Sequence, residues 1–120
     1  MTEVIESFAQ ATRRCARLGL DMIEIHSAHG YLLSSFLSPV ANRRTDRYGG
    51  GLENRMRFPL EVVAAVRRNW PSDKPLGVRF NGTDWLEGGI APEEADRIMA
   101  IIDELTTEDE GDNTDGGRNA

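Results

Sequence analysis

The residues best suited to chemistry in this sequence are two histidines and a tyrosine that lie close together, His26, His29 and Tyr31. Two imidazoles three residues apart on a turn can converge on one small acceptor, and each can donate an N–H to a carbonyl or nitro oxygen. A nearby tyrosine hydroxyl can then deliver a proton to the carbon that is left electron-rich. The alternative is a structural role, in which His29 caps the turn and Tyr31 packs in the core.

Two histidines can also bind zinc or iron, and this third interpretation requires a further ligand. The obvious acidic candidates near His26 and His29 are Glu24 and Asp46, and neither has a fixed relation to the pair in the sequence. We therefore predict no metal at this site.

A second candidate is Arg79, which stands in the otherwise apolar run Leu76–Phe80 and is followed by Asn81, Asp84 and Trp85. An arginine buried in such a strand needs a partner, because an unpaired buried charge is costly. The partner is either a structural carboxylate or an electron-rich ligand atom. A permanent cation in such a place would stabilise negative charge on a bound ligand.

Hydrophobic spacing predicts helices and strands that would place both candidates where strands end, which is where parallel α/β folds carry their active sites. The alternation predicts an α/β domain with parallel strands, the second of them buried on both faces. The predicted elements are helix Val4–Leu18, strand Met22–His26, short helix Leu32–Leu37, helix Glu53–Trp70, strand Leu76–Phe80, and a helix from Pro92 whose apolar face is Ala95, Ile98, Met99, Ile102 and Leu105.

The first helix has apolar residues at spacings of three and four, which predicts one buried face. Its members are Val4, Phe8, Ala11, Cys15 and Leu18. Cys15 is the only cysteine of the chain, so it forms no internal disulfide, and we interpret it as a small core residue rather than a reactive thiol.

Charge and composition narrow the class of protein. The formal net charge of the 120 residues is −6, and residues 106–120, with five acids and one arginine, contribute −4 of it. The rest of the chain is nearly balanced and has no clustered basic face, so we predict no nucleic-acid partner. No apolar run is long enough to cross a membrane and no leader peptide is visible, which favours a cytoplasmic protein without a membrane partner.

Several short and uncommon sequence motifs, here called words, occur together between Phe8 and Leu105. They are Ile25–Leu33 (IHSAHGYLL), Phe36–Pro39 (FLSP), Asn42–Gly50 (NRRTDRYGG), Glu53–Arg55 (ENR), Arg57-Phe58, Val78–Phe80 (VRF), Thr83–Trp85 (TDW) and Glu87–Gly89 (EGG). In order and spacing they resemble the Old Yellow Enzyme family of NADH:flavin oxidoreductases, and the last three words resemble its thermophilic-like subgroup of ene-reductases. Gly51 stands where that family usually has serine, and Asn81-Gly82 stands where it usually has Ser-Ala.

The resemblance implies a (β/α)₈ TIM barrel with FMN at its mouth, of which this chain would hold about strands four and five with flanking helices. NADPH or NADH would reduce the flavin, and a small electron-poor alkene, such as an α,β-unsaturated carbonyl compound, would then be reduced. By the family motif, His26 and His29 hold the substrate's activating oxygen and Tyr31 is the proton donor. Arg79 maps to the arginine at the pyrimidine edge of the flavin, and full-length members would be homo-oligomers.

The length of the chain is about half that of a typical barrel of roughly 250 residues. We therefore expect residues 1–105 to be a partial flavin oxidoreductase barrel segment and residues 106–120 to be an acidic, disordered tail. The segment is expected to be inactive alone. The alternatives are a subunit that completes a barrel with other chains and a non-catalytic interaction module descended from the family.

Overall fold

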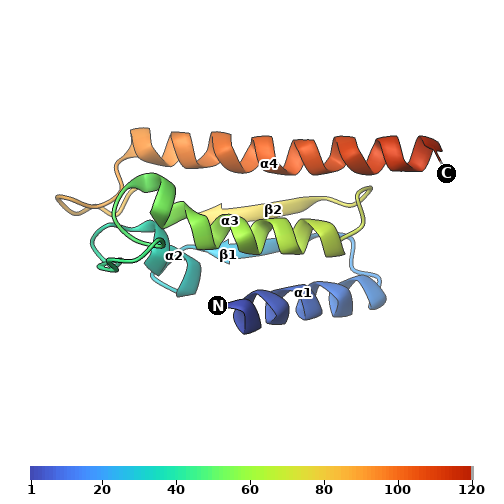
Figure 1. Cartoon of the computed structure of the whole chain (residues 1–120), viewed down its shortest axis with the longest axis horizontal. Helices are drawn as coiled ribbons and strands as arrows, with labels where there is room; N and C mark the ends of the chain where they lie inside the picture. The colour runs from blue at the N-terminus through green and yellow to red at the C-terminus, as the bar shows by residue number, and fades with distance from the viewer. Residues whose placement is uncertain (120) are drawn as a thin grey trace.

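The structure is a computed structural model that describes residues 1–119, with side chains described through Thr106. Its elements, in order, are α1 (Thr2–Arg17), β1 (Ile23–Ser27), α2 (Leu32–Leu37), α3 (Leu52–Asn69), β2 (Leu76–Phe80) and α4 (Pro92–Asn119) (Figure 1). The predicted bounds of α2 and β2 are confirmed, whereas β1 begins and ends one residue later than predicted. None of the described helices is both long enough and apolar enough to cross a membrane.

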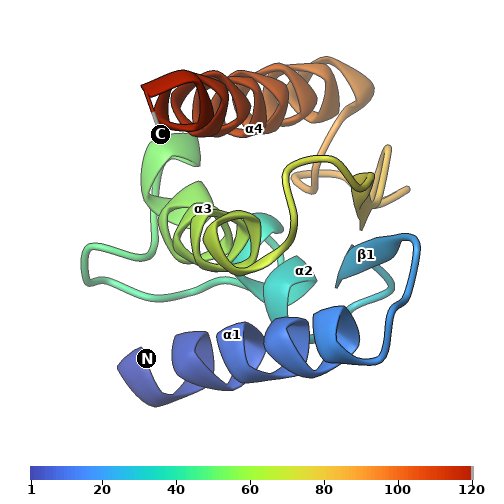
Figure 2. The same cartoon turned by 90° about the vertical axis from the view of Figure 1, so that its right-hand side faces the viewer.

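The two strands form a small parallel sheet, as predicted for an α/β domain. In its register Ile25 lies beside Val78, His26 beside Arg79 and Ser27 beside Phe80. Helix α3 lies between α1 and α4 in both views, and Figure 2 shows the three helices curving around one side of the strands (Figures 1 and 2). Because side chains alternate along a strand, one face of the sheet packs on helices while no other described element covers the opposite face.

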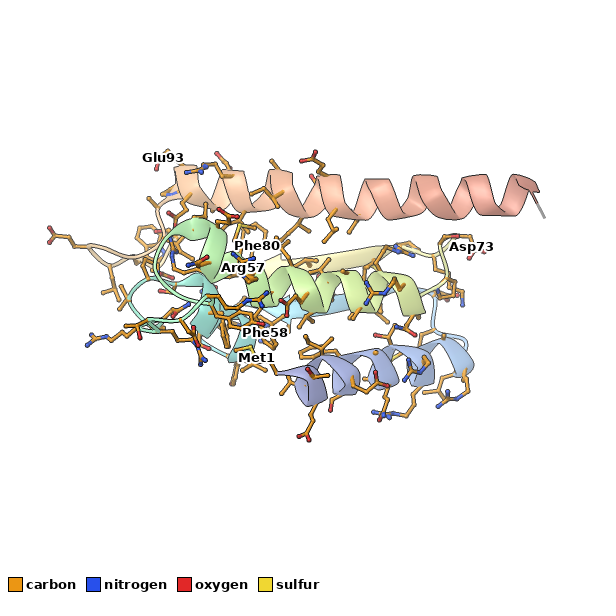
Figure 3. The ribbon with its side chains drawn as sticks, in the orientation of Figure 1. Met1, Arg57, Phe58, Asp73, Phe80 and Glu93 are labelled. Carbon is orange, nitrogen blue, oxygen red and sulfur yellow. The ribbon has the colours of Figure 1, made fainter. Side chains whose placement is uncertain are left out.

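Helix α3 is the centre of the hydrophobic core. Phe58, Val62, Val63 and Val66 are each at most 2% exposed and pack with Ile25 of the sheet. Figure 3 labels Phe58 on this helix. A second cluster joins α3 to α4 and the loop before it. Its buried members are Leu37, Met56, Ile90, Ala95, Ile98 and Ile102. The predicted apolar face of α4 is therefore confirmed except at Met99, which is 50% exposed because it lies beside the uncovered edge of β2.

The end of α3 leads into β2 through a buried tryptophan. Trp70 is 2% exposed, and its indole Nε1–H donates to the carbonyl oxygen of Pro75 at 3.0 Å. A buried indole N–H needs such an acceptor. This hydrogen bond fixes the turn that delivers the chain to Leu76.

The predicted buried face of α1 is wrong by part of a turn. Val4 is 37% exposed and Leu18 is 77% exposed, whereas Ala9 and Thr12 are buried. Thr12 can face the core because its hydroxyl donates to the carbonyl oxygen of Phe8 at 2.8 Å, so its burial leaves no polar atom unsatisfied. Tertiary packing against α3 thus overrides the apolar spacing that the sequence presents, and Cys15 is only half-buried.

The prediction that β2 is buried on both faces is also wrong. Leu76, Val78 and Phe80 are half-buried against the helices, but Arg79 is exposed. The physical reason is the alternation of side chains, since Arg79 lies on the face that no described helix covers. Its charge therefore needs no buried partner.

Helix α4 is continuous through Leu105, where the apolar pattern ends. Side chains beyond Thr106 lie outside the described residues. The predicted boundary between a barrel segment and an acidic tail at residues 105 and 106 therefore stays a prediction.

The long segment between α2 and α3 is held by side-chain amides. The Asn42 Nδ2 group donates to the carbonyl oxygens of Phe36 and Tyr48, each at 2.8 Å, and Asn54 Nδ2 donates to that of Gly49. A Cβ at Gly49 would overlap the carbonyl group of Arg44, so only glycine fits there. The segment is thus closed on itself rather than loosely extended.

A buried guanidinium joins this segment to α4. Arg55 is 5% exposed, and its donors reach the carbonyl oxygens of Leu37 and Gly50. Its remaining N–H groups donate to both carboxylate oxygens of Glu94, at 3.0 and 3.1 Å. Such a bidentate pair fixes orientation as well as distance.

Replacing Glu94 with alanine tests this connection. Glu94→Ala leaves the buried Arg55 guanidinium with only carbonyl partners, so we expect the free energy of unfolding to fall by about 2 kcal/mol. Glu93→Ala is the matched control, since Glu93 is exposed in the same first turn of α4 and should change stability far less. Urea unfolding followed by circular dichroism measures both, and equal losses would contradict the role of Arg55.

Candidate functional site

The candidate site lies on the uncovered face of the sheet, at the ends of its two strands. His26 and Arg79 are register partners in neighbouring strands, so their side chains leave the sheet on the same face. Both residues are exposed. Strand pairing alone therefore brings the predicted acceptor-binding residue and the predicted flavin-binding residue together across 53 positions of sequence.

The turn after β1 brings both other predicted residues to His26. The ring centroids of His26 and His29 are 5.3 Å apart, and those of His26 and Tyr31 are 5.4 Å apart. Tyr31 is 66% exposed, which excludes the alternative in which it packs in the core. The backbone folds back through left-handed residues, with φ of 60° at His29 and 76° at Gly30. The three rings therefore lie close together at the end of β1, and all three residues are exposed.

An asparagine at the end of β2 ties this turn in place. The backbone N–H of His29 donates to Asn81 Oδ1 at 3.1 Å. The Asn81 Nδ2 group donates to Ser34 Oγ at 3.4 Å, and the N–H of Gly30 reaches the same oxygen at 3.3 Å. Ser34 is buried, so this tie is anchored in α2. Asn81 was predicted only as a neighbour of Arg79, and its contact with His29 could not be inferred from sequence.

The loop after β2 is also closed by its own hydrogen bonds. Asp84 Oδ2 accepts the hydroxyl of Ser38 at 2.6 Å and the N–H of Ile90 at 2.8 Å. At its tip Trp85 is 89% exposed and has a positive φ of 57°, which is uncommon for a bulky residue. The hydrogen-bonded loop therefore presents the large aromatic side chain of Trp85 to solvent.

The same loop forms one side of a shallow groove of about 520 Å³. The groove is lined by His29 and Arg79 and by the loop from Phe80 to Trp85. It combines an imidazole, a guanidinium and an indole along one open surface. That combination suits a flat, electron-rich ligand, because guanidinium and aromatic groups both bind such faces and edges.

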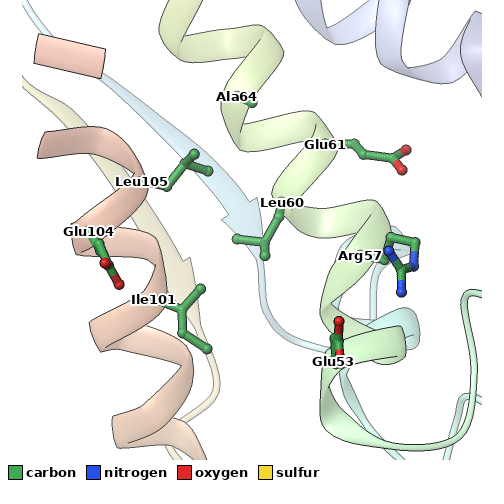
Figure 4. Close-up of a pocket in the computed structure, with 8 residues that line it drawn as sticks. All are labelled: Glu53, Arg57, Leu60, Glu61, Ala64, Ile101, Glu104 and Leu105. Carbon is green, nitrogen blue, oxygen red and sulfur yellow. The ribbon is translucent and has the colours of Figure 1, made fainter. Parts of the chain in front are cut away.

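Another hollow, of about 530 Å³, lies between α3 and α4 on the outer helical layer (Figure 4). Its lining combines aliphatic side chains, among them Leu60 and Ile101, with the charged side chains of Glu53, Arg57, Glu61 and Glu104. None of the predicted site residues lines it. The two hollows are similar in size, so size does not indicate which one is the functional site. The side chains that line them favour the groove at the strand ends.

The residues present fit one part of a flavin. Within the described residues no hydrogen bond or ion pair engages the Arg79 guanidinium, so this cation is available to the electron-rich edge of a ring. Asn81 and Trp85 add a polar and an aromatic surface next to it. The described residues contain no group of three histidine, cysteine or acidic side chains placed to hold a metal ion.

Sequence comparison places these features in a family. Residues 1–116 match the sequence profile of the NADH:flavin oxidoreductase / NADH oxidase family. The chain is 48% identical over 104 residues to an NADPH dehydrogenase of Clostridium acetobutylicum, a match that covers 86% of this chain and 31% of that protein. The chain thus spans less than a third of the length of this relative.

Structural comparison agrees with the sequence. A 2-naphthoyl-CoA reductase in complex with 2-naphthoyl-CoA has a TM-score of 0.82 and 38% identity, covering 87% of this chain and 16% of that one. Morphinone reductase in complex with tetrahydroNAD has a TM-score of 0.76 and 39% identity, covering 88% of this chain and 30% of that one. Both neighbours are TIM barrels of the Old Yellow Enzyme type, which confirms the resemblance that the sequence words indicate.

The closed loop after β2 can be tested at Asp84. Asp84→Ala removes the acceptor of the Ile90 N–H, so we expect the exchange of that amide with deuterium to rise at least about tenfold. Asp73→Ala, an exposed aspartate before β2 (Figure 3), is the control and should leave Ile90 protected. An unchanged exchange rate in Asp84→Ala would mean that other contacts close the loop.

Proposed function

Because this chain belongs to the NADH:flavin oxidoreductase / NADH oxidase family, we propose that it forms the acceptor-binding part of an FMN-dependent NAD(P)H oxidoreductase. The acceptor is an electron-poor alkene such as an α,β-unsaturated carbonyl compound. The observation that carries this proposal is the convergence of His26, His29 and Tyr31 beside Arg79 on one open face. By this assignment β1 and β2 are the fourth and fifth strands of the family's barrel.

Arg79 would contact the electron-rich edge of the FMN ring. When bound, FMN supplies the hydride chemistry of the reaction, with NADPH or NADH as the reductant. The exposed position of Arg79 supports this role, because its guanidinium is already on the face where a ring would lie. A guanidinium stays charged throughout and can hold a ring edge through several N–H donors.

His26 and His29 would hold the acceptor's oxygen. Rings 5.3 Å apart at 72° leave room for two N–H groups to meet one small atom from different directions. Donors aimed at an oxygen that becomes more negative stabilise the transition state more than the ground state. The pair would thus activate the alkene as well as bind it.

Tyr31 would deliver the proton to the carbon next to the activating group. Its ring centroid lies 5.4 Å from that of His26, and the residue is 66% exposed. A phenol is a weak acid, so it serves a strongly basic carbon and stays protonated otherwise. The same exposure that excludes a core role leaves the hydroxyl accessible to a substrate.

A barrel chimera tests the proposal for His26. We would replace the matching segment of the Clostridium acetobutylicum NADPH dehydrogenase with residues 8–105 of this chain. In that chimera His26→Ala should weaken the binding of phenol ligands and slow alkene reduction about a hundredfold, which corresponds to ~3 kcal/mol of lost transition-state stabilisation. Reduction of FMN by the nicotinamide should change much less. Stopped-flow measurement of the two half-reactions decides between these effects.

The outcome that would contradict the proposal is specific. If His26→Ala leaves phenol affinity and alkene reduction unchanged in an otherwise active chimera, the turn does not hold the acceptor. A chimera that folds and binds FMN but reduces no alkene would favour the non-catalytic alternative. The unsubstituted relative, assayed in parallel, shows that the assay reports both half-reactions.

Tyr31→Phe should separate proton delivery from binding. The substitution keeps the ring but removes the hydroxyl, so phenol affinity should stay within about twofold while alkene reduction slows by a factor on the order of 10². Water can supply the proton in part, which limits the loss of rate. A matched fall in affinity and rate would instead place Tyr31 among the groups that hold the acceptor.

A further inference from the structure

We propose that Asn81 is a positioning residue that sets His29 against His26 and against Arg79. The effect of Asn81 on catalysis rests on the proposed function, whereas its effect on the turn does not. The structural content of the proposal concerns one side chain at the end of β2 and one backbone N–H in the turn after β1. Asn81 lines the groove beside Arg79, and the role proposed for it is exerted through the turn that carries His29.

The turn that Asn81 holds is conformationally unfavourable without outside contacts. His29 has a φ of 60°, in the left-handed region that side chains with a Cβ rarely adopt, and Gly30 follows at 76°. Residues held in that region persist when their surroundings fix them. In this turn the fixing contacts come from Asn81 and Ser34, since the N–H of His29 and the N–H of Gly30 are bound by these two side chains.

The asparagine amide suits this position because both of its ends are used. Oδ1 accepts the N–H of His29 at 3.1 Å, and Nδ2 donates to the Ser34 hydroxyl at 3.4 Å. The reverse orientation of the amide would set an NH₂ group against the N–H of His29. A serine or alanine at this position is too short to connect the same two partners.

Asn81 also links the two strand ends that make up the candidate site. It directly follows the last residue of β2, two positions after Arg79, and it binds the backbone N–H of His29, three positions after His26. Its hydrogen bond therefore sets where the His29 imidazole lies relative to the Arg79 guanidinium. In the proposed function His29 holds the acceptor's oxygen and Arg79 contacts the FMN ring. Asn81 would therefore set the distance between the acceptor and FMN.

The free chain provides a direct test, because His26 and His29 are its only histidines. Imidazole NMR signals therefore report the site and nothing else. In the unsubstituted chain we expect a nuclear Overhauser effect between the two rings and slow deuterium exchange at the His29 amide. Asn81→Ala and Asn81→Ser should abolish the ring contact and raise the exchange rate of that amide at least about tenfold.

Two further variants separate positioning from general stability. Asn81→Asp keeps an acceptor for the His29 N–H and should restore both the ring contact and the slow exchange. Asn69→Ala removes another asparagine whose amide makes two hydrogen bonds, to Arg13 and Ala65, far from the site, and should leave both histidine signals unchanged.

The proposal is overturned if the His29 amide and the ring contact are unaffected in Asn81→Ala, or if Asn69→Ala changes them as much. It is equally overturned if Asn81→Asp fails to restore them. These measurements need no catalysis, so they stay informative if the proposed reaction is wrong. His26→Ala in the same chain should leave the His29 amide protected, which distinguishes the positioning of the turn from the function of the clamp.

Discussion

The segments around the site depend on one buried interaction, the ion pair between the Arg55 guanidinium and Glu94. The guanidinium binds carbonyl oxygens on both sides of the segment between α2 and α3, and it pairs with Glu94 in the first turn of α4. A charge 5% exposed can be retained only if its donors are satisfied. Meeting that requirement closes the segment after α2 and holds the start of α4 against it, directly after the loop from β2 that borders the site.

The position of the site follows from the pairing of β1 with β2. Parallel pairing puts His26 beside Arg79, and alternation sends both side chains to the face without helices. The turn after β1 then depends on contacts from two different elements, α2 through Ser34 and the end of β2 through Asn81. The paired strands therefore place His26 and Arg79, whereas hydrogen bonds between elements place His29.

Much of this could be predicted from the sequence, because its causes are local. Apolar periodicity located the helices and strands, and the spacing of His26, His29 and Tyr31 indicated their convergence. The exposure of Arg79, the buried face of α1 and the pairing of Arg55 with Glu94 could not be predicted. Each depends on which element covers which face, and that is decided by packing between residues tens of positions apart. The contact of Asn81 with His29 likewise spans 52 positions.

The two tryptophans give the chain a built-in optical distinction. The indole of Trp70 is enclosed at 2% exposure, whereas that of Trp85 is at 89% and borders the groove. Emission from an enclosed indole lies to the blue of emission from a hydrated one, so the two contribute different colours to one spectrum. Loss of the core changes the blue component, and a ligand stacked in the groove changes the red one. Folding and occupancy can therefore be followed separately in a single cuvette without a label.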